Sequence, residues 1–492
     1  MSRPPDVATF RNDDNVWVSA ERDPVPYEIS LSCSQVSGFL CRAKKRAAVR
    51  DAGNALLRRH STTAGSSSLA SGIVAGAKDA TGKRQKTRER LVVRIDDRWV
   101  DLTGWRKAHP AGSHWIDVYK NSDATEVMYG FHSDMAMSML ERLPTARKED
   151  IPGEIPDVTP HTYAFRKLRA KLVEEGWFKR NPFMEAGTLS SYLLTMTLAV
   201  AAAQTGQLWL AALMLAVSNT SAGWIAHDYI HGRGWWPMLM RGFGELGGGM
   251  SATWWSDKHN IHHALTNVVG VDEDLMVDPA LFLWPPSAEN DNPLVRRIQH
   301  LYWFFPYSLL FAIWRIDSVK VALNRKLWGE AGRLLAHYGI LAALFPGFTM
   351  FRRVLLPALF ISGLLTATIV TVSHISEDIF FNGPHKVDFV ENQLRATRDF
   401  DCSNPLNEYL AGGMNYQIEH HLFPTMPRYK YPALQKVLKK FASENNLTYR
   451  TESDWSILRR TVNMLKMVAK APVDPRGAPS RSDEWVLPAA QR

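Results

Sequence analysis

Seven of the chain's 16 histidines gather in three pentapeptides that lie far apart in the sequence. The three clusters are His227-Asp-Tyr-Ile-His231, His259-Asn-Ile-His262-His263 and Gln417-Ile-Glu-His420-His421. Because residues at i, i+3 and i+4 share one face of a helix, each cluster directs its imidazoles the same way. Long apolar stretches separate the clusters, so the pattern predicts one metal site assembled from distant parts of the chain.

The number of histidines limits which metal they serve. Imidazole binds iron, zinc, copper and nickel. A structural zinc takes four ligands and a catalytic zinc usually takes three, so seven or more imidazoles exceed one zinc and fit two metal ions. The sequence contains no His-Glu-x-x-His motif, which disfavours metal-dependent hydrolysis.

Composition restricts the class of protein further. The chain has 492 residues and a net charge of +9, and its polarity is segregated into a basic first part and two strongly apolar regions. A basic chain of this kind suits an anionic membrane face. Nucleic acid binding is disfavoured because aromatic residues do not interleave with the basic runs. Three cysteines without regular spacing fit a reducing compartment.

The polar parts of the chain divide into short regions. Residues 1–90 are predicted to be a disordered basic extension, with an organelle transit peptide as the alternative. Segments 91–95 and 99–102 read as two strands around an Asp-Asp turn. A proline-rich linker is expected over 144–160, and a charged helix over 161–180. The tail, 471–492, is predicted to be disordered.

Four uncharged stretches form two close pairs, at 189–203 with 208–226 and at 334–350 with 354–372. We interpret them as membrane-spanning helices, the alternative being the buried core of a large soluble enzyme. Each pair returns the chain to its starting side, so all three clusters emerge on one membrane face. The basic segments make that face cytosolic, although Arg352 and Arg353 fall in the predicted opposite loop. Two shorter apolar segments, 235–250 and 302–314, are expected to lie at the membrane interface.

A second histidine pattern precedes these spans. His109-Pro-Ala-Gly and, later, Phe131-His132-Ser133 make residues 91–143 resemble a cytochrome b5 domain. The resemblance implies a small α+β domain that binds haem b through His109 and His132. Two axial imidazoles leave the iron no open position, so such a haem transfers single electrons. Ala111 stands where the family motif has its first glycine.

The order of this domain and the three clusters resembles the b5-fusion front-end fatty acyl desaturases over about 91–450. Gln417 is the sharpest feature, because most other membrane desaturases and hydroxylases have histidine there. The resemblance implies a mainly α fold, in which an integral membrane four-helix core, 161–460, carries a cytosolic cap formed by the clusters.

The resemblance also implies the site. The seven cluster histidines would bind two non-haem iron ions, His374 would supply a further imidazole, and Gln417 would be a weak ligand or hold a water. The implied metal-site residues are His227, His231, His259, His262, His263, His374, Gln417, His420 and His421. Asp228, Asn260 and Glu419 either orient these imidazoles or face water.

The implied reaction introduces a cis double bond between an existing double bond and the carboxyl end of a fatty acyl chain. It uses O2 and electrons from NADH through cytochrome b5 reductase. The position of the new bond and the acyl carrier, coenzyme A or phospholipid, stay open. Alternatives are a sphingolipid long-chain-base Δ8 desaturase, a fatty acyl hydroxylase and a membrane redox carrier. The expected location is the endoplasmic reticulum membrane with both termini cytosolic, or else a plastid.

Overall fold

A computed structural model describes residues 10–11, 17–18, 90–109, 112–153, 158–286, 288, 290–381, 388–473 and 484–485. The predictions of disorder for 1–90 and 471–492 lie for the most part outside these residues. The chain forms two compact units, which we treat separately. The smaller comprises Ser34–Asp123 and Leu143–Ile155, and the larger takes in Met1–Cys33, Ala124–Arg142 and Pro156–Arg492. This division passes through the predicted b5-like domain.

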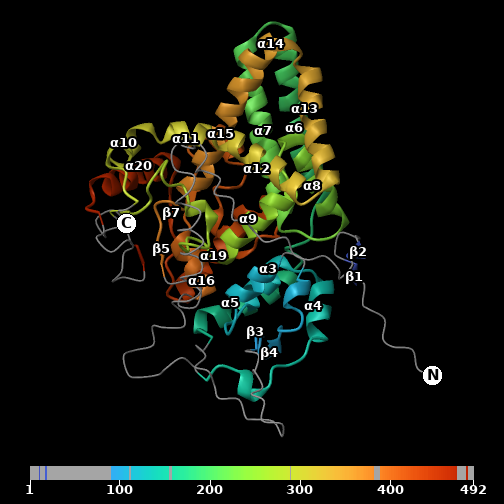
Figure 1. Cartoon of the computed structure of the whole chain (residues 1–492), viewed down its shortest axis with the longest axis vertical. Coiled ribbons are helices and arrows are strands. Elements are labelled where there is room, and N and C mark those ends of the chain that lie inside the picture. Colours follow the sequence, from blue (N-terminus) through green and yellow to red (C-terminus); the bar gives the residue numbers. More distant parts are fainter. Residues whose placement is uncertain are drawn as a thin grey trace, which may run out of the picture. The chain divides into compact units, whose positions relative to one another are not determined.

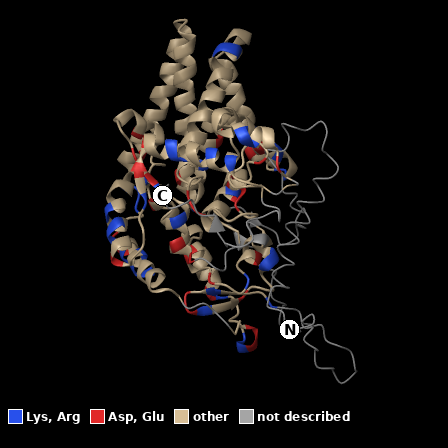
Figure 2. Ribbon diagram, turned by 90° about the vertical axis from the view of Figure 1, so that its left-hand side faces the viewer, with Lys and Arg blue, Asp and Glu red and all other residues tan. Residues whose placement is uncertain are grey.

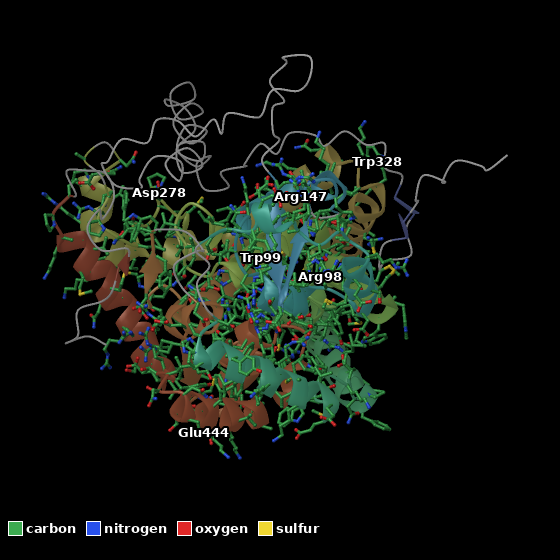
Figure 3. The ribbon with its side chains drawn as sticks, turned by 90° about the horizontal axis from the view of Figure 1, so that it is seen from below. Arg98, Trp99, Arg147, Asp278, Trp328 and Glu444 are labelled. Carbon is green, nitrogen blue, oxygen red and sulfur yellow. The ribbon has the colours of Figure 1, made fainter. Side chains whose placement is uncertain are left out.

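The smaller unit is built on the predicted hairpin. Strands β3 (Val92–Ile95) and β4 (Arg98–Asp101) pair antiparallel, which confirms the two strands, and Asp96 makes the turn with φ of 53°. The chain later returns to this hairpin, because the Ala146 N–H donates to the Trp99 carbonyl at 2.8 Å. The predicted linker therefore begins with residues that pair with the hairpin (Figure 3, where Arg98, Trp99 and Arg147 are labelled). The remaining elements are η1 (Arg106–Ala108), α2 (Ser113–Val118) and η2 (Lys148–Asp150).

The larger unit begins with three helices before the membrane spans. They are α3 (Thr125–Phe131), α4 (Asp134–Glu141) and α5 (Pro160–Glu174). The Thr159 hydroxyl caps α5 by accepting from the Thr162 N–H at 3.2 Å. Phe165 and Leu172 on its apolar face are buried, and they join a core formed with the C-terminal helices. Two short strands, β1 (Phe10–Arg11) and β2 (Trp17–Val18), pair antiparallel earlier in the chain.

The apolar stretches form a helical bundle, seen in Figure 1 as α6, α7, α13 and α15 running alongside one another. Its helices are α6 (Pro182–Gln204), α7 (Leu208–Ile230), α13 (Trp328–Leu344) and the continuous segment α14 (Gly347–Met350), η4 (Phe351–Leu355) and α15 (Leu356–Val372). Within the described residues, α6, α7 and the segment Gly347–Val372 are long and apolar enough to cross a membrane. The mainly α membrane fold is thus confirmed, with α13 as a shorter fourth member of the bundle.

The predicted loop at Arg352 and Arg353 is wrong. Both residues lie in a π-helical turn that continues directly into α15, and the chain instead breaks between α13 and α14, at Phe345 and Pro346. In Figure 2 the outer part of the bundle is almost free of charged residues, except for a basic patch near its tip. Sequence alone misplaced the boundary because two charges inside an apolar run resemble a loop, whereas long arginine side chains reach water from a helix end.

Shorter helices surround the inner end of the bundle. The predicted interfacial segment 235–250 forms α8 (Trp235–Gly248), and 302–314 divides between α11 (Phe304–Ser308) and α12 (Leu310–Asn324). The cap below the bundle contains α9 (Ala252–Ala264), η3 (Glu273–Leu275), α10 (Pro293–Tyr302), α16 (Phe389–Ala396), α17 (Pro405–Ala411), α18 (Gln417–Leu422), η5 (Arg428–Lys430), α19 (Tyr431–Glu444) and α20 (Asp454–Lys470). Parallel strands β6 (Asp399–Asp401) and β7 (Thr451–Ser453) join its halves, while β5 (Ile379–Phe380) pairs with β8 (Glu484–Trp485).

Candidate metal centre

The first histidine cluster lies at the inner end of a membrane-spanning helix. His227 is in the last turn of α7, and His231 is the residue that ends it. Gly234, with φ of 95°, then turns the chain into α8. The position of α7 therefore determines where these two imidazoles lie relative to the end of the apolar bundle.

A close contact ties this helix to the segment that precedes the third cluster. Trp224, one turn before His227, donates its indole N–H to the Leu410 carbonyl at 2.8 Å. Gly412 has φ of 59°, and a Cβ atom at this position would lie 2.2 Å from the Trp224 ring. Only glycine satisfies both the left-handed backbone and this close approach.

The second and third clusters occupy two buried helices of the cap. Ser251 caps α9, which carries His259, His262 and His263 below the bundle (Figure 1). Helix α18 carries His420 and His421, and the buried Asp399 carboxylate accepts the Ile418 N–H at its start at 2.9 Å. Neighbouring residues on a helix point about 100° apart, so the adjacent histidines of each cluster cannot face the same point.

The structure brings all eight predicted histidines together in two groups. In each group, every residue offers a ring nitrogen, and these atoms all lie within 4.8 Å of one another. The first group contains His227, His231, His259, His263 and His420, and the second contains His262, His374 and His421. All eight are buried. His374 follows α15 directly, where the sequence placed it, at the inner end of the last span.

Five of these imidazoles form a hydrogen bond through Nδ1 to an outer partner, and four of them donate, because their partner is a carbonyl, amide or carboxylate oxygen. The pairs are His231 with Asn260 at 2.6 Å, His262 with Asp272 at 2.8 Å, His374 with the Ala396 carbonyl at 3.1 Å, His420 with the Tyr431 hydroxyl at 3.2 Å and His421 with Gln393 at 2.8 Å. Where the imidazole donates, the bond fixes the ring tautomer and leaves Nε2 as the basic nitrogen, the arrangement typical of metal-bound histidine.

Burial and neighbouring charge shift the pKa values of His374 and His262, both in the second group, in opposite directions. Burial lowers the pKa of His374 to about 3, so this imidazole is neutral at physiological pH and its ring nitrogen can bind a cation. Burial also opposes protonation of His262, but the charge of Asp272 outweighs it and raises the pKa of His262. A cation at this group would take the place of the proton that Asp272 favours.

The donor set fits metal ions better than it fits a hydrogen-bonded core. His231, His374 and His420 each have a buried Nε2 without a hydrogen-bond partner among the described residues. Buried polar atoms are rarely left unpaired in folded proteins because an unpaired atom costs about 1–3 kcal/mol. Several such nitrogens converging on two points are therefore best explained by two bound cations. Neutral imidazole suits iron among other transition metals.

Gln417 and the polar residues inside the clusters have distinct places. Gln417 is buried on the first turn of α18, and its Oε1 has no hydrogen-bond partner among the described residues. Asp228, Asn260 and Glu419 were expected either to orient the imidazoles or to face water. Asn260 orients the His231 imidazole. Asp228 instead pairs with Arg428 at 3.0 Å, and buried Glu419 accepts from the Tyr449 hydroxyl at 2.6 Å.

Sequence reasoning missed two buried residues beside the clusters. Asp272 lies ten residues after His262, and Gln393 is on α16, which carries no cluster. The Gln393 amide accepts from His421 through Oε1 and donates through Nε2 to the His263 carbonyl at 3.1 Å. It therefore contacts one histidine of each group. The one sequence signal for Gln393 is that it is a polar residue on the apolar face of an amphipathic helix.

The two predicted haem ligands lie in different compact units, and each is described alone. His109 follows η1, and its Nδ1 is 3.1 Å from the Gly112 carbonyl. His132 follows α3, and its Nδ1 is 3.2 Å from the Met128 carbonyl. In both residues this bond makes Nε2 the basic nitrogen, as axial ligation of haem requires. Haem binding by this pair stays a prediction, and Ala111 lies outside the described residues.

Known proteins resemble the chain over most of its length. The family described as "Fatty acid desaturase" matches residues 205–453, and "Cytochrome b5-like Heme/Steroid binding domain" matches residues 79–148. "Delta(6)-fatty-acid desaturase fat-3" of Caenorhabditis elegans is 30% identical over 452 residues, covering 80% of this chain and 98% of that protein. "Acyl-lipid 8-desaturase" of Rebecca salina is 29% identical, covering 74% and 89%. "Delta(5) fatty acid desaturase fat-4" of C. elegans is 27% identical, covering 79% and 98%.

Proposed function

Because this chain belongs to the fatty acid desaturase family and includes a cytochrome b5-like domain, we propose that it is a front-end desaturase with a non-haem diiron centre. The new cis double bond would lie between an existing double bond and the carboxyl end of an unsaturated fatty acyl chain. The observation that carries the proposal is the convergence of eight buried imidazoles into two groups.

The protein's own residues would hold and orient the metal ions. His227, His231, His259, His263 and His420 would hold one iron, and His262, His374 and His421 the other, with Gln417 beside them as a weak ligand or a holder of water. The acceptors Asn260, Asp272 and Gln393 would keep three of these rings in the metal-binding tautomer. When bound, such an iron pair supplies the O2-dependent oxidation of an unactivated C–H bond. Burial of the whole set excludes bulk water from this chemistry.

The b5-like domain supports an internal electron supply. His109 and His132 would bind haem b, and NADH would reduce it through a separate cytochrome b5 reductase. The apolar bundle places the enzyme in a membrane, and we propose the endoplasmic reticulum with both termini cytosolic, where such a reductase can reach the domain. The substrate would be an acyl-CoA or an acyl phospholipid.

The substrate class follows from the relatives. Their printed names give positions 5, 6 and 8 for the desaturation that those relatives carry out. To test the proposal, yeast expressing the full chain would receive single defined polyunsaturated acids, and the new double bond would be located by mass spectrometry. A host lipid desaturated on its long-chain base instead of its acyl chain would contradict the proposal.

His262→Ala tests the metal centre within the same experiment. Removing this imidazole deprives the second group of a ligand and leaves Asp272 without its partner, so we expect no detectable product. The haem absorption spectrum should be unchanged, because His262 lies outside the b5-like domain. His300→Ala, which alters a histidine on α10 outside both groups, is the matched control and should retain activity. Desaturation by His262→Ala at the wild-type rate would refute the site assignment.

A further inference from the structure

A phenylalanine from the b5-like domain lies directly against the metal centre. Phe131 is the last residue of α3, and its side chain is only 7% exposed. Its ring centroid is 5.6 Å from that of His231 at an interplanar angle of 35°, and 6.4 Å from that of His263 at 88°. Both histidines belong to the five-membered group. One aromatic ring therefore contacts two of the predicted iron ligands.

Independent contacts hold α3 in this place. Arg166 on α5 donates from Nε to the Glu126 carboxylate at 2.7 Å, and both side chains are largely buried. Arg169 donates to the Tyr129 carbonyl at 3.1 Å, and its guanidinium lies 4.5 Å from the centroid of the Tyr129 ring. All these residues belong to the same compact unit as the histidine clusters. The position of Phe131 is thus set by an anchored helix as well as by its own ring.

The next residue in the chain is the predicted haem ligand His132. We propose that Phe131 is the electronic bridge of the enzyme, joining the haem-ligating end of α3 to the five-histidine group. An electron passing from the His132 imidazole to that of His231 or His263 would cross one peptide unit and one ring contact. This inference rests on the proposed function, since it needs haem at His132 and iron at the histidine groups.

The electrons and atoms balance for this route. Each passage oxidises one ferrous haem to the ferric state and reduces one ferric ion of the diiron centre to the ferrous state. Two passages supply two electrons, and the two C–H bonds that break supply two more electrons and two protons. With two further protons from solvent, one O2 becomes two water molecules. Phe131 itself is neither oxidised nor reduced overall, so its role is to position and couple the two ends.

The test measures electron transfer without turnover. Full-length protein loaded with haem and ferric iron would be kept free of O2, a flash-excited flavin would reduce the haem, and the decay of the ferrous haem band would be followed. Protein stripped of non-haem iron gives the background decay. We expect Phe131→Ala to slow the iron-dependent decay by about tenfold, which corresponds to ~1.4 kcal/mol in activation free energy. Phe131→Leu should be slowed less, and Phe131→Trp should restore a rate near that of the wild type.

Tyr163→Leu is the matched control, because it removes an exposed aromatic ring of α5 that contacts Lys167 and lies outside both histidine groups. Its decay rate should stay within about twofold of the wild type, a difference of less than ~0.5 kcal/mol in barrier. Haem midpoint potential and iron content should be unchanged in every variant used. If Phe131→Ala loses iron, the comparison of Phe131→Leu with Phe131→Trp decides. Wild-type decay in iron-loaded Phe131→Leu, or equal slowing in Tyr163→Leu, would overturn the proposal. A wild-type protein that transfers the electron but makes no double bond would instead refute the proposed function.

Discussion

At the scale of single residues, the buried partners of the histidines matter as much as the histidines themselves. Imidazole binds a cation only in the correct tautomer and orientation, and both depend on the group that accepts the Nδ1 proton. Here the acceptors include two side-chain amides, a carboxylate and a backbone carbonyl. The second group has the carboxylate, Asp272, so its ion would face more negative charge than an ion in the first group.

Gln393 allows this outer layer to be tested. Gln393→Leu removes the acceptor of the His421 Nδ1 proton, and we expect iron affinity to fall by roughly 10–100-fold. Gln393→Glu keeps an acceptor oxygen there and should retain most of the iron, measured by metal analysis of the purified protein. Gln299→Leu is the matched control, since Gln299 is equally buried but bonds the backbone of Phe282 and Leu465. Equal iron loss in Gln299→Leu would show a general effect on folding.

The residues that sequence reasoning found and missed differ in a physical way. The cluster histidines were predictable because their spacing is local and matches the helical repeat. His374 was predictable only through a family resemblance together with its place at the end of a span. Asp272 and Gln393 lack any local pattern, and tertiary packing alone brings them to the imidazoles.

At the scale of elements, the site depends on how closely α7 approaches the chain before α18. Gly412→Ala would place a methyl group against the Trp224 ring and strain a left-handed backbone. We expect the free energy of unfolding to fall by about 1–3 kcal/mol, seen as a lower melting temperature in detergent. The control Gly206→Ala has a similar positive φ but open space around the added carbon, so it reports the backbone strain alone. Equal losses in both variants would exclude a role for the close contact.

Elements were predictable where one interaction dominates. The alternation of β3 and β4, the apolar face of α5 and the uncharged runs of α6 and α7 each follow from burial of one face or of a whole segment. The end of α13 and the continuous helix through Arg352 could not be predicted from the apolar pattern of the sequence. A helix in a membrane tolerates charge at its end, and packing between neighbouring helices decides where the chain breaks.

At the scale of the whole molecule, the outer surface of the bundle needs an apolar solvent. Leu194 lies near the middle of α6 and its side chain is 59% exposed. Leu194→Arg should cost about 2.5–3.5 kcal/mol on membrane insertion, lowering the fraction of protein that resists alkaline extraction from membranes. Leu406→Arg alters an equally exposed leucine, 63%, on α17 in the cap and should insert normally. Equal insertion of both variants would argue against α6 as a lipid-facing span.

The division of adjacent histidines between the two groups has a consequence for how the protein matures. His262 and His263 belong to different groups, as do His420 and His421, so one bound ion already fixes the helix that presents ligands to the other. The ends of the first group, His227 and His420, are 420 − 227 = 193 residues apart. A bound ion there acts as a cross-link that closes a very long loop, and its binding free energy adds to the stability of the folded chain. With the proposed iron bound, metal supply would contribute to folding stability: the second ion would meet a preformed site, and chains made without iron would lack this cross-link.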